Sequence, residues 1–226
     1  MGNSASLGVE AKRNARGLLV SRRIQGLELG KKSFFFISGV IISVSFTIYA
    51  KNLTNPLLFQ HLKRILAIRI WSTAILTPLI EEFAKAYPLL PRNEDTKKSL
   101  ITLGFLVGLG FGINEFFLYI TQRDASIYIR LPVIFLHAAT TAITAYGIKR
   151  DKPLLPYLTA FSLHSAYNLS GIYNIHWLTS RYPILLATIL IAAHVYSKKS
   201  TPSLRGGQVS ELLGPSTDEG LETIIV

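Results

Sequence analysis

Apolar blocks close to the length that crosses a bilayer, roughly 20 residues each, dominate this chain. Charged residues make up only 16% of the 226 residues, against about 25% in a soluble domain. A segment in lipid must satisfy its own backbone hydrogen bonds, so each block is predicted to be a helix. We therefore expect an all-α, polytopic integral membrane helix bundle of about six spans. They are predicted at Phe34–Ala50, Ile65–Tyr87, Leu100–Thr121, Tyr128–Ile148, Leu154–Tyr173 and Tyr182–Tyr196.

The positive charge of the chain follows the predicted spans. The net charge of +11 is carried by Lys and Arg that mostly flank the apolar blocks, as membrane insertion requires, so we expect no nucleic-acid partner. Seventeen of these residues lie in the N-terminal segment, the second and fourth loops and the tail, and six lie in the other loops. This asymmetry predicts that both termini are cytoplasmic, with the cell membrane as the expected location.

Three regions are expected along the chain. Residues 1–33 form a basic N-terminal segment, part of which could lie on the membrane surface as an interfacial helix. Residues 34–197 form the transmembrane domain. Residues 198–226 are rich in small and polar residues and are expected to be a disordered cytoplasmic tail. The chain has no cysteine, which excludes disulfides, thiolate metal ligands and a cysteine nucleophile.

Carboxylates inside the apolar blocks are the most informative residues. Only Glu81, Glu82 and Glu115 of the thirteen acidic residues lie there. Each costs about 2.5–3.5 kcal/mol at the centre of a membrane helix if it is ionised and unpaired, so pairing, protonation or a metal must offset the cost. Lys85 lies one turn after Glu81 and Glu82 and can pair with either. This pattern predicts a functional site, because ionisable residues within membrane helices usually have a function.

The following blocks add two histidines near mid-span. His137 shares a helix face with Arg130, Thr141 and Thr144, and His164 shares one with Asn168. Gly104, Gly108 and Gly112 recur every four residues, which favours close helix packing, and Glu115 extends that face. At 1.5 Å of helix rise per residue, the two histidines lie about 16 Å from the cytoplasmic ends of their spans. Glu115 lies about 22 Å from that end of its span and Glu82 under 10 Å. On straight, parallel helices these residues would therefore lie at different depths.

Taken together, four motifs between Leu76 and Ser170 resemble the motif series of the PrsW protease family. They are Glu81-Glu82-x-x-Lys85, Phe111-x-x-x-Glu115, Arg130 with His137-x-x-x-Thr141, and His164-x-x-x-Asn168. The family comprises multi-spanning endopeptidases related to the CAAX prenyl proteases and the bacteriocin-immunity-type membrane proteases. That superfamily often has Arg and a longer spacing after the glutamate pair, and His at the position of Glu115. Both differences favour the PrsW branch.

The resemblance implies hydrolysis of a peptide bond in or beside the membrane, on a membrane-protein or membrane-associated peptide substrate. Glu81 or Glu82 would take a proton from the attacking water, and His164 and Asn168 could donate to the oxyanion. In a metal version, Glu115, His137 and His164 would bind zinc and leave a position for water. The sequence leaves the zinc-dependent and metal-free versions open. Two other functions are a proton- or cation-coupled transporter or channel that uses the buried Glu and His, and a non-catalytic scaffold.

Overall fold

The structure is a computed structural model. It describes residues 25–43, 64–91, 96–123, 125–173 and 177–198, with a few single residues between positions 45 and 60. The first 24 residues and those from position 199 lie outside the described residues. The disordered tail and the part of the interfacial helix before residue 25 therefore stay predictions. Within the described part, residues 25–38 form one helix that leads directly into the first predicted span.

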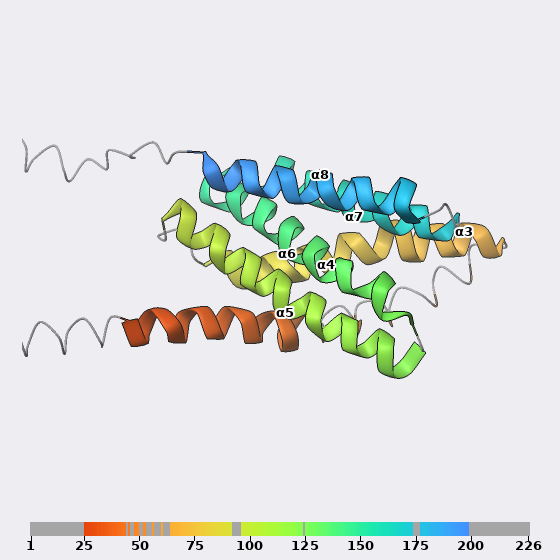
Figure 1. The fold of residues 1–226 in the computed structure, drawn as a ribbon, viewed down its shortest axis with the longest axis horizontal. Helices are drawn as coiled ribbons and strands as arrows, with labels where there is room; N and C mark the ends of the chain where they lie inside the picture. The colour runs from red at the N-terminus through yellow and green to blue at the C-terminus, as the bar shows by residue number, and fades with distance from the viewer. Residues whose placement is uncertain are drawn as a thin grey trace, which may run out of the picture.

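All regular elements of the described residues are helices, as the sequence predicts (Figure 1). After residues 25–38 comes a π-helical turn, η1, at Gly39–Ser43. One long segment then consists of α3 (Ile65–Arg69), the π-helix η2 (Ile70–Leu76), α4 (Thr77–Ala86) and the 3₁₀ turn η3 (Tyr87–Leu89). It is followed by α5 (Lys97–Arg123), α6 (Ile127–Lys149), α7 (Leu154–Ile172) and α8 (Trp177–Ser197). From the third predicted span to the last, these helices match the prediction to within five residues at each end. The first helix begins at residue 25, nine residues before the predicted Phe34, and most of 44–50 lies outside the described residues.

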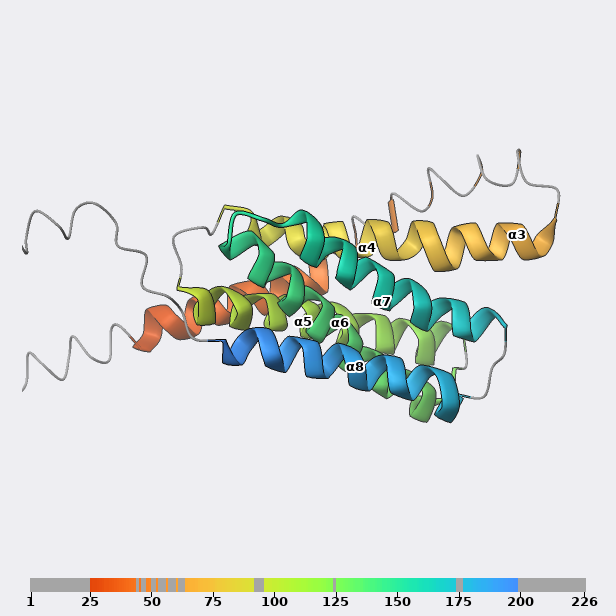
Figure 2. The ribbon, with the colours of Figure 1, turned by 90° about the horizontal axis from the view of Figure 1, so that it is seen from above.

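Two of the described helices, α5 and α6, are long and apolar enough by themselves to cross a membrane. Within α8, the apolar part Arg181–Ser197 is shorter. Helix α6 lies at the centre of the bundle, with most of its side chains buried from Val133 to Ile148. The N-terminal helix packs beside α5, and α7 lies between the α3–α4 segment and α8 (Figures 1 and 2).

Close packing of α5 on α6 depends on glycine. A Cβ atom at Gly108 would overlap the backbone carbonyl oxygen of His137, and one at Gly112 would lie too close to the Cα atom of Ile134. The small-residue face predicted from the sequence thus allows the two helix backbones to touch. Helix α5 runs obliquely across the bundle in Figure 1. This contact fixes the backbone of α6 at His137, a residue of the candidate site.

Candidate functional site: a buried Glu, His and Lys cluster

The helix that carries the glutamate pair is held in place by its neighbour α7. In the π-helix η2 each carbonyl accepts from the N–H five residues later, as Ser72 does from Thr77. The next carbonyl, of Thr73, would need the N–H of Pro78, which proline lacks. Asn168 Nδ2 on α7 donates to that carbonyl instead, at 3.0 Å. The π-helix and Pro78 therefore create a backbone acceptor that joins α7 to the start of α4.

Glu82 is the most heavily bonded carboxylate of the cluster. Its Oε1 accepts from Lys85 Nζ at 2.6 Å, from Thr140 Oγ1 at 3.2 Å and from His164 Nδ1 at 2.8 Å. Its Oε2 is buried and has no hydrogen-bond partner in the described part of the chain. All four side chains are buried. The pairing predicted for Lys85 thus goes to Glu82, and Glu82 also fixes the ring orientation of His164.

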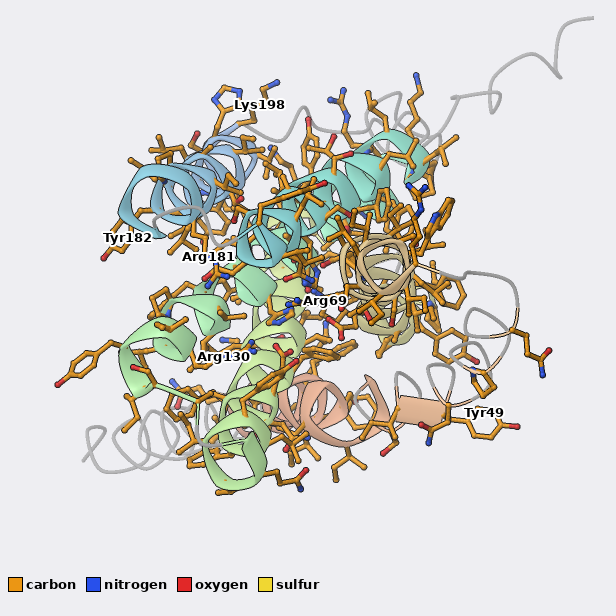
Figure 3. All side chains as sticks on the ribbon, turned by 90° about the vertical axis from the view of Figure 1, so that its right-hand side faces the viewer. Tyr49, Arg69, Arg130, Arg181, Tyr182 and Lys198 are labelled. Carbon is orange, nitrogen blue, oxygen red and sulfur yellow. The ribbon has the colours of Figure 1, made fainter. Side chains whose placement is uncertain are left out.

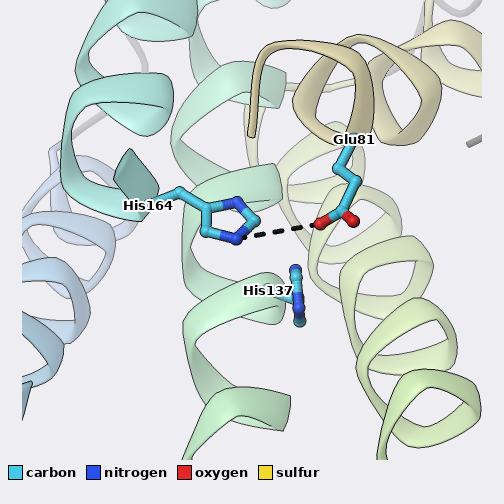
Figure 4. Close-up of side chains that lie close together, drawn as sticks. All are labelled: Glu81, His137 and His164. Carbon is cyan, nitrogen blue, oxygen red and sulfur yellow. Dashed lines mark ion pairs between the residues drawn. The ribbon is translucent and has the colours of Figure 1, made fainter. Parts of the chain in front are cut away.

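Glu81 faces the opposite nitrogen of His164. The distance from its Oε2 to His164 Nε2 is 3.7 Å (Figure 4). The His137 ring lies beside them, with its centroid 5.0 Å from that of His164. One ligand atom from each of Glu81, His137 and His164 lies within 4.8 Å of the others, so this group could hold a metal ion. The three side chains come from α4, α6 and α7, and all are buried.

His137 connects this group to Glu115 on α5. Its Nε2 lies 2.6 Å from Glu115 Oε2, and its Nδ1 lies 3.1 Å from Lys85 Nζ. Because an ammonium can only donate, Nδ1 is the acceptor of that contact and Nε2 carries the proton that Glu115 accepts. Phe111, one turn before Glu115, packs on the His137 ring at 4.8 Å between centroids. The ring of His137 is thus held on three sides.

The structure brings together six of the seven residues singled out for chemistry from the sequence. Glu81, Glu82, Lys85, Glu115, His137 and His164 form one polar cluster joined by direct contacts. The seventh, Asn168, lines the adjoining cavity and is bonded to backbone. The predicted metal ligands were Glu115, His137 and His164, whereas the compact group in the structure has Glu81 in place of Glu115.

Sequence reasoning missed Thr140. It selected Thr141 and Thr144 from the polar stripe of α6, but among the described residues both bond only to carbonyls of their own helix. Thr140 instead accepts from Lys85 Nζ at 3.2 Å and donates to Glu82. Its spacing of three residues from His137 was the available signal, because residues three apart also share a helix face.

A cavity of about 340 Å³ adjoins the cluster and is lined by residues of five helical segments. His164, Glu115 and Asn168 line it. Its other polar lining comes from three arginines and from Ser72, Thr73, Thr77, Tyr119 and Tyr167. These arginines, Arg69, Arg130 and Arg181, come from three different helices, and Figure 3 labels them in a view along the bundle. A ligand in this cavity would reach His164 directly.

Comparison with known proteins identifies the family. Residues 32–194, which include the whole polar cluster, match the model of the PrsW family intramembrane metalloprotease. The comparisons with curated proteins and with solved structures give no match. The family match supports an integral membrane peptidase and does not favour a transporter. The chain therefore belongs to the PrsW family of intramembrane metalloproteases.

Proposed function

We propose that this protein hydrolyses a peptide bond of a membrane-protein substrate in or near the bilayer, with a zinc ion held by Glu81, His137 and His164. The observation that carries the proposal is the placement of three potential ligand atoms within 4.8 Å of one another inside a helical bundle. The family to which the chain belongs consists of membrane metalloproteases, which agrees with a metal at this position.

The donor set fits zinc in type, and one pair of its ligand atoms also lies close to the expected spacing. One carboxylate oxygen and two imidazole nitrogens are typical zinc ligands, and three protein ligands leave the fourth position for water. Bonds of about 2.0–2.2 Å in a tetrahedral site separate two ligand atoms by roughly 3.3–3.5 Å. The 3.7 Å between Glu81 Oε2 and His164 Nε2 is close to this value. The 2.6 Å between Glu115 and His137 is a hydrogen-bond distance instead.

This spacing supports a change in the ligand assignment made from the sequence. Glu81 replaces Glu115 as the carboxylate ligand. Glu115 instead accepts the Nε2 proton of His137, and Glu82 accepts from Nδ1 of His164. A carboxylate that binds the far nitrogen of a ligand histidine fixes the tautomer and orientation of the ring. Each histidine then has a carboxylate on one nitrogen, as metal-binding histidines usually do. In His137 the nitrogen left for zinc is Nδ1, so a bound ion would replace the present contact of Nδ1 with Lys85 Nζ.

Glu82 is our proposed proton acceptor. Its Oε1 is occupied by three donors, but its Oε2 has no hydrogen bond among the described residues and can take a proton from the attacking water. The Lys85 ammonium balances the charge of Glu82 at 2.6 Å. A bound zinc ion would supply Lewis-acid activation of the water and of the substrate carbonyl. Glu82 would then return the proton to the leaving amine.

Asn168 is proposed to stabilise the oxyanion. One of its two amide N–H groups is bonded to the Thr73 carbonyl, which fixes the side chain, and the residue lines the cavity beside His164. The other N–H is available to a substrate carbonyl oxygen. Donors held rigidly at the position where charge develops contribute most to catalysis of this kind.

We place the protein in the cell membrane with both termini cytoplasmic, on the distribution of Lys and Arg.

Cleavage by the purified, reconstituted protein tests the proposal. A panel of transmembrane peptides with flanking residues is incubated with the zinc-loaded protein, and products are identified by mass spectrometry. Glu82→Gln should lower the rate by about 10²–10⁴, the usual contribution of a general base. Glu28→Gln, a change at an exposed glutamate of the N-terminal helix, is the matched control and should cleave normally. A chelator should abolish cleavage, and zinc should restore it.

Three results would contradict the proposal. If the wild-type protein cuts no peptide of the panel, the proposed hydrolysis of transmembrane peptides is wrong. If cleavage persists in the double variant Glu81→Gln with Glu82→Gln, another group carries the reaction. If a chelator that strips the protein of metal leaves the rate unchanged, the metal-free version with a glutamate base replaces the zinc version.

A further inference from the structure

The three arginines of the cavity, Arg69, Arg130 and Arg181, are here called the arginine cluster. Each lies about one turn inside the first residue of its helix, α3, α6 or α8. These three helices begin toward the same end of the bundle, with α3 extending farther out than α6 and α8 (Figures 1 and 2). Their three guanidinium groups line one cavity.

The cavity has more positive than negative charge. Of the residues that the structure describes, Glu115 is the only carboxylate that lines it, and it is already bonded to His137. No carboxylate of the described residues lies within ion-pair distance of any of the three guanidinium groups. An anion that enters the cavity would be attracted by this excess of positive charge. The charge balance thus points to an anionic ligand.

Two of the guanidinium groups are held in place by packing and keep N–H groups that can bind a ligand. Arg130 stacks on the ring of Tyr119 at 3.3 Å, a contact that uses the face of the guanidinium and leaves its in-plane N–H groups available. Arg181 packs so closely on Gly171 that a Cβ there would overlap its guanidinium. The Nε atom of Arg181 is buried and has no hydrogen-bond partner among the described residues. A guanidinium held in this way can donate two parallel hydrogen bonds to a carboxylate or a phosphate.

We propose that the arginine cluster binds a carboxylate of the peptide substrate and thereby selects acidic residues near the scissile bond. This inference rests on the proposed peptidase function. A peptide is favoured over a lipid because the same cavity continues to His164 and Asn168. Arg130 lies seven residues before His137, about 10 Å along the helix, and an extended chain covers about 3.3 Å per residue. The selected acidic residue therefore lies about three residues from the cleaved bond.

Paired substrates test this selection. Transmembrane peptides carry Glu or Gln at each of the four positions on either side of the cleaved bond, and kcat and KM are measured in zwitterionic lipid. The wild-type protein should prefer one Glu position by about 10-fold or more, through a lower KM, since a charged hydrogen bond contributes that much. Arg130→Gln and Arg181→Gln should each reduce the ratio of kcat/KM between the Glu and Gln peptides. Lys152→Gln, at an exposed lysine between α6 and α7, is the matched control.

Binding separates failure of this inference from failure of the peptidase function. Fluorescent Glu and Gln peptides are titrated against Glu82→Gln protein and against wild-type protein stripped of metal. Tighter binding of the Glu peptide, lost in Arg130→Gln, supports the carboxylate site even if no cleavage occurs. Equal binding and equal cleavage of both peptides would overturn it. Competition by anionic lipid, with no preference between peptides, would assign the arginine cluster to a lipid phosphate instead.

Discussion

Removing the charge of Lys85 tests how the polar cluster remains buried in the bundle. Lys85→Met keeps the length of the side chain but deletes the ammonium. In the structure, Nζ lies 2.6 Å from Glu82 Oε1, and both side chains are fully buried. Deletion of one partner of a buried ion pair leaves an uncompensated charge and costs about 3–5 kcal/mol. We expect the free energy of unfolding of Lys85→Met to fall by this amount.

The double variant Lys85→Met with Glu82→Gln provides the internal comparison. Neither buried charge remains, and the new amide side chain at position 82 can still bond to Thr140 and His164, which contact Glu82 in the native protein. The double variant should therefore lose less stability than the sum of the two single variants. A coupling free energy of about 2 kcal/mol between the two positions is expected, within the range for residues in direct contact.

Unfolding in mixed micelles with increasing dodecyl sulfate measures these differences, with Trp71 and Trp177 as intrinsic fluorescent probes. Lys152→Met, at an exposed lysine, is the matched control and should be neutral. The account of the cluster is refuted if Lys85→Met lies within about 1 kcal/mol of the wild-type protein. It is equally refuted if the double variant shows the full sum of the single losses, because the two charges would then be independent.

Two further predictions concern the packing that positions the cluster. Gly108→Ala introduces a Cβ that overlaps the His137 carbonyl, so it should destabilise the protein by about 1–3 kcal/mol and weaken zinc binding, both measured on purified protein. Unchanged zinc affinity would show that the α5–α6 contact does not position His137. Asn168→Ala should leave the Thr73 carbonyl without its donor, costing about 1–3 kcal/mol in the same unfolding assay and also lowering kcat. A variant with normal stability and normal kcat would remove both roles given to Asn168.

The positions of the helices were predictable because span length and apolarity are local properties. The block at Tyr128–Ile148 agrees with α6 at Ile127–Lys149 to within one residue at each end. The members of the polar cluster were predictable for a related reason. An ionisable group in an apolar block is costly, so Glu81, Glu115 and the two histidines stand out from the sequence without any structure.

The contacts between these residues were not predictable, because they depend on how helices cross. Depths calculated along straight, parallel spans place Glu115 and Glu82 more than 10 Å apart. The structure nevertheless joins them through His137, because α5 crosses the bundle obliquely and its glycines touch α6 (Figure 1). The sequence shows which residues share a helix face. It does not show at which position along their axes two tilted helices come into contact.

The bond of Asn168 to the Thr73 carbonyl and the role of the arginine cluster could not be predicted, for a different reason. The backbone acceptor for Asn168 exists only because a π-helix precedes Pro78, and no local sequence pattern predicts the π-helix. The arginines at positions 130 and 181 lie at the ends of predicted spans. A basic residue at such a position is normally explained by the orientation of the span in the membrane. Only the three-dimensional arrangement shows that they share one cavity with His164.

Metal content of the purified protein tests the central claim most directly. Elemental analysis after exchange into metal-free buffer should find about one zinc per chain in the wild-type protein. Glu81→Gln, His137→Gln and His164→Gln should each lose most of it, while Glu115→Gln should keep zinc with an affinity about 10–100-fold lower, as expected for a residue that orients a ligand. A wild-type protein free of zinc, or Glu81→Gln protein with full zinc, would contradict the assignment of Glu81, His137 and His164 as the metal ligands.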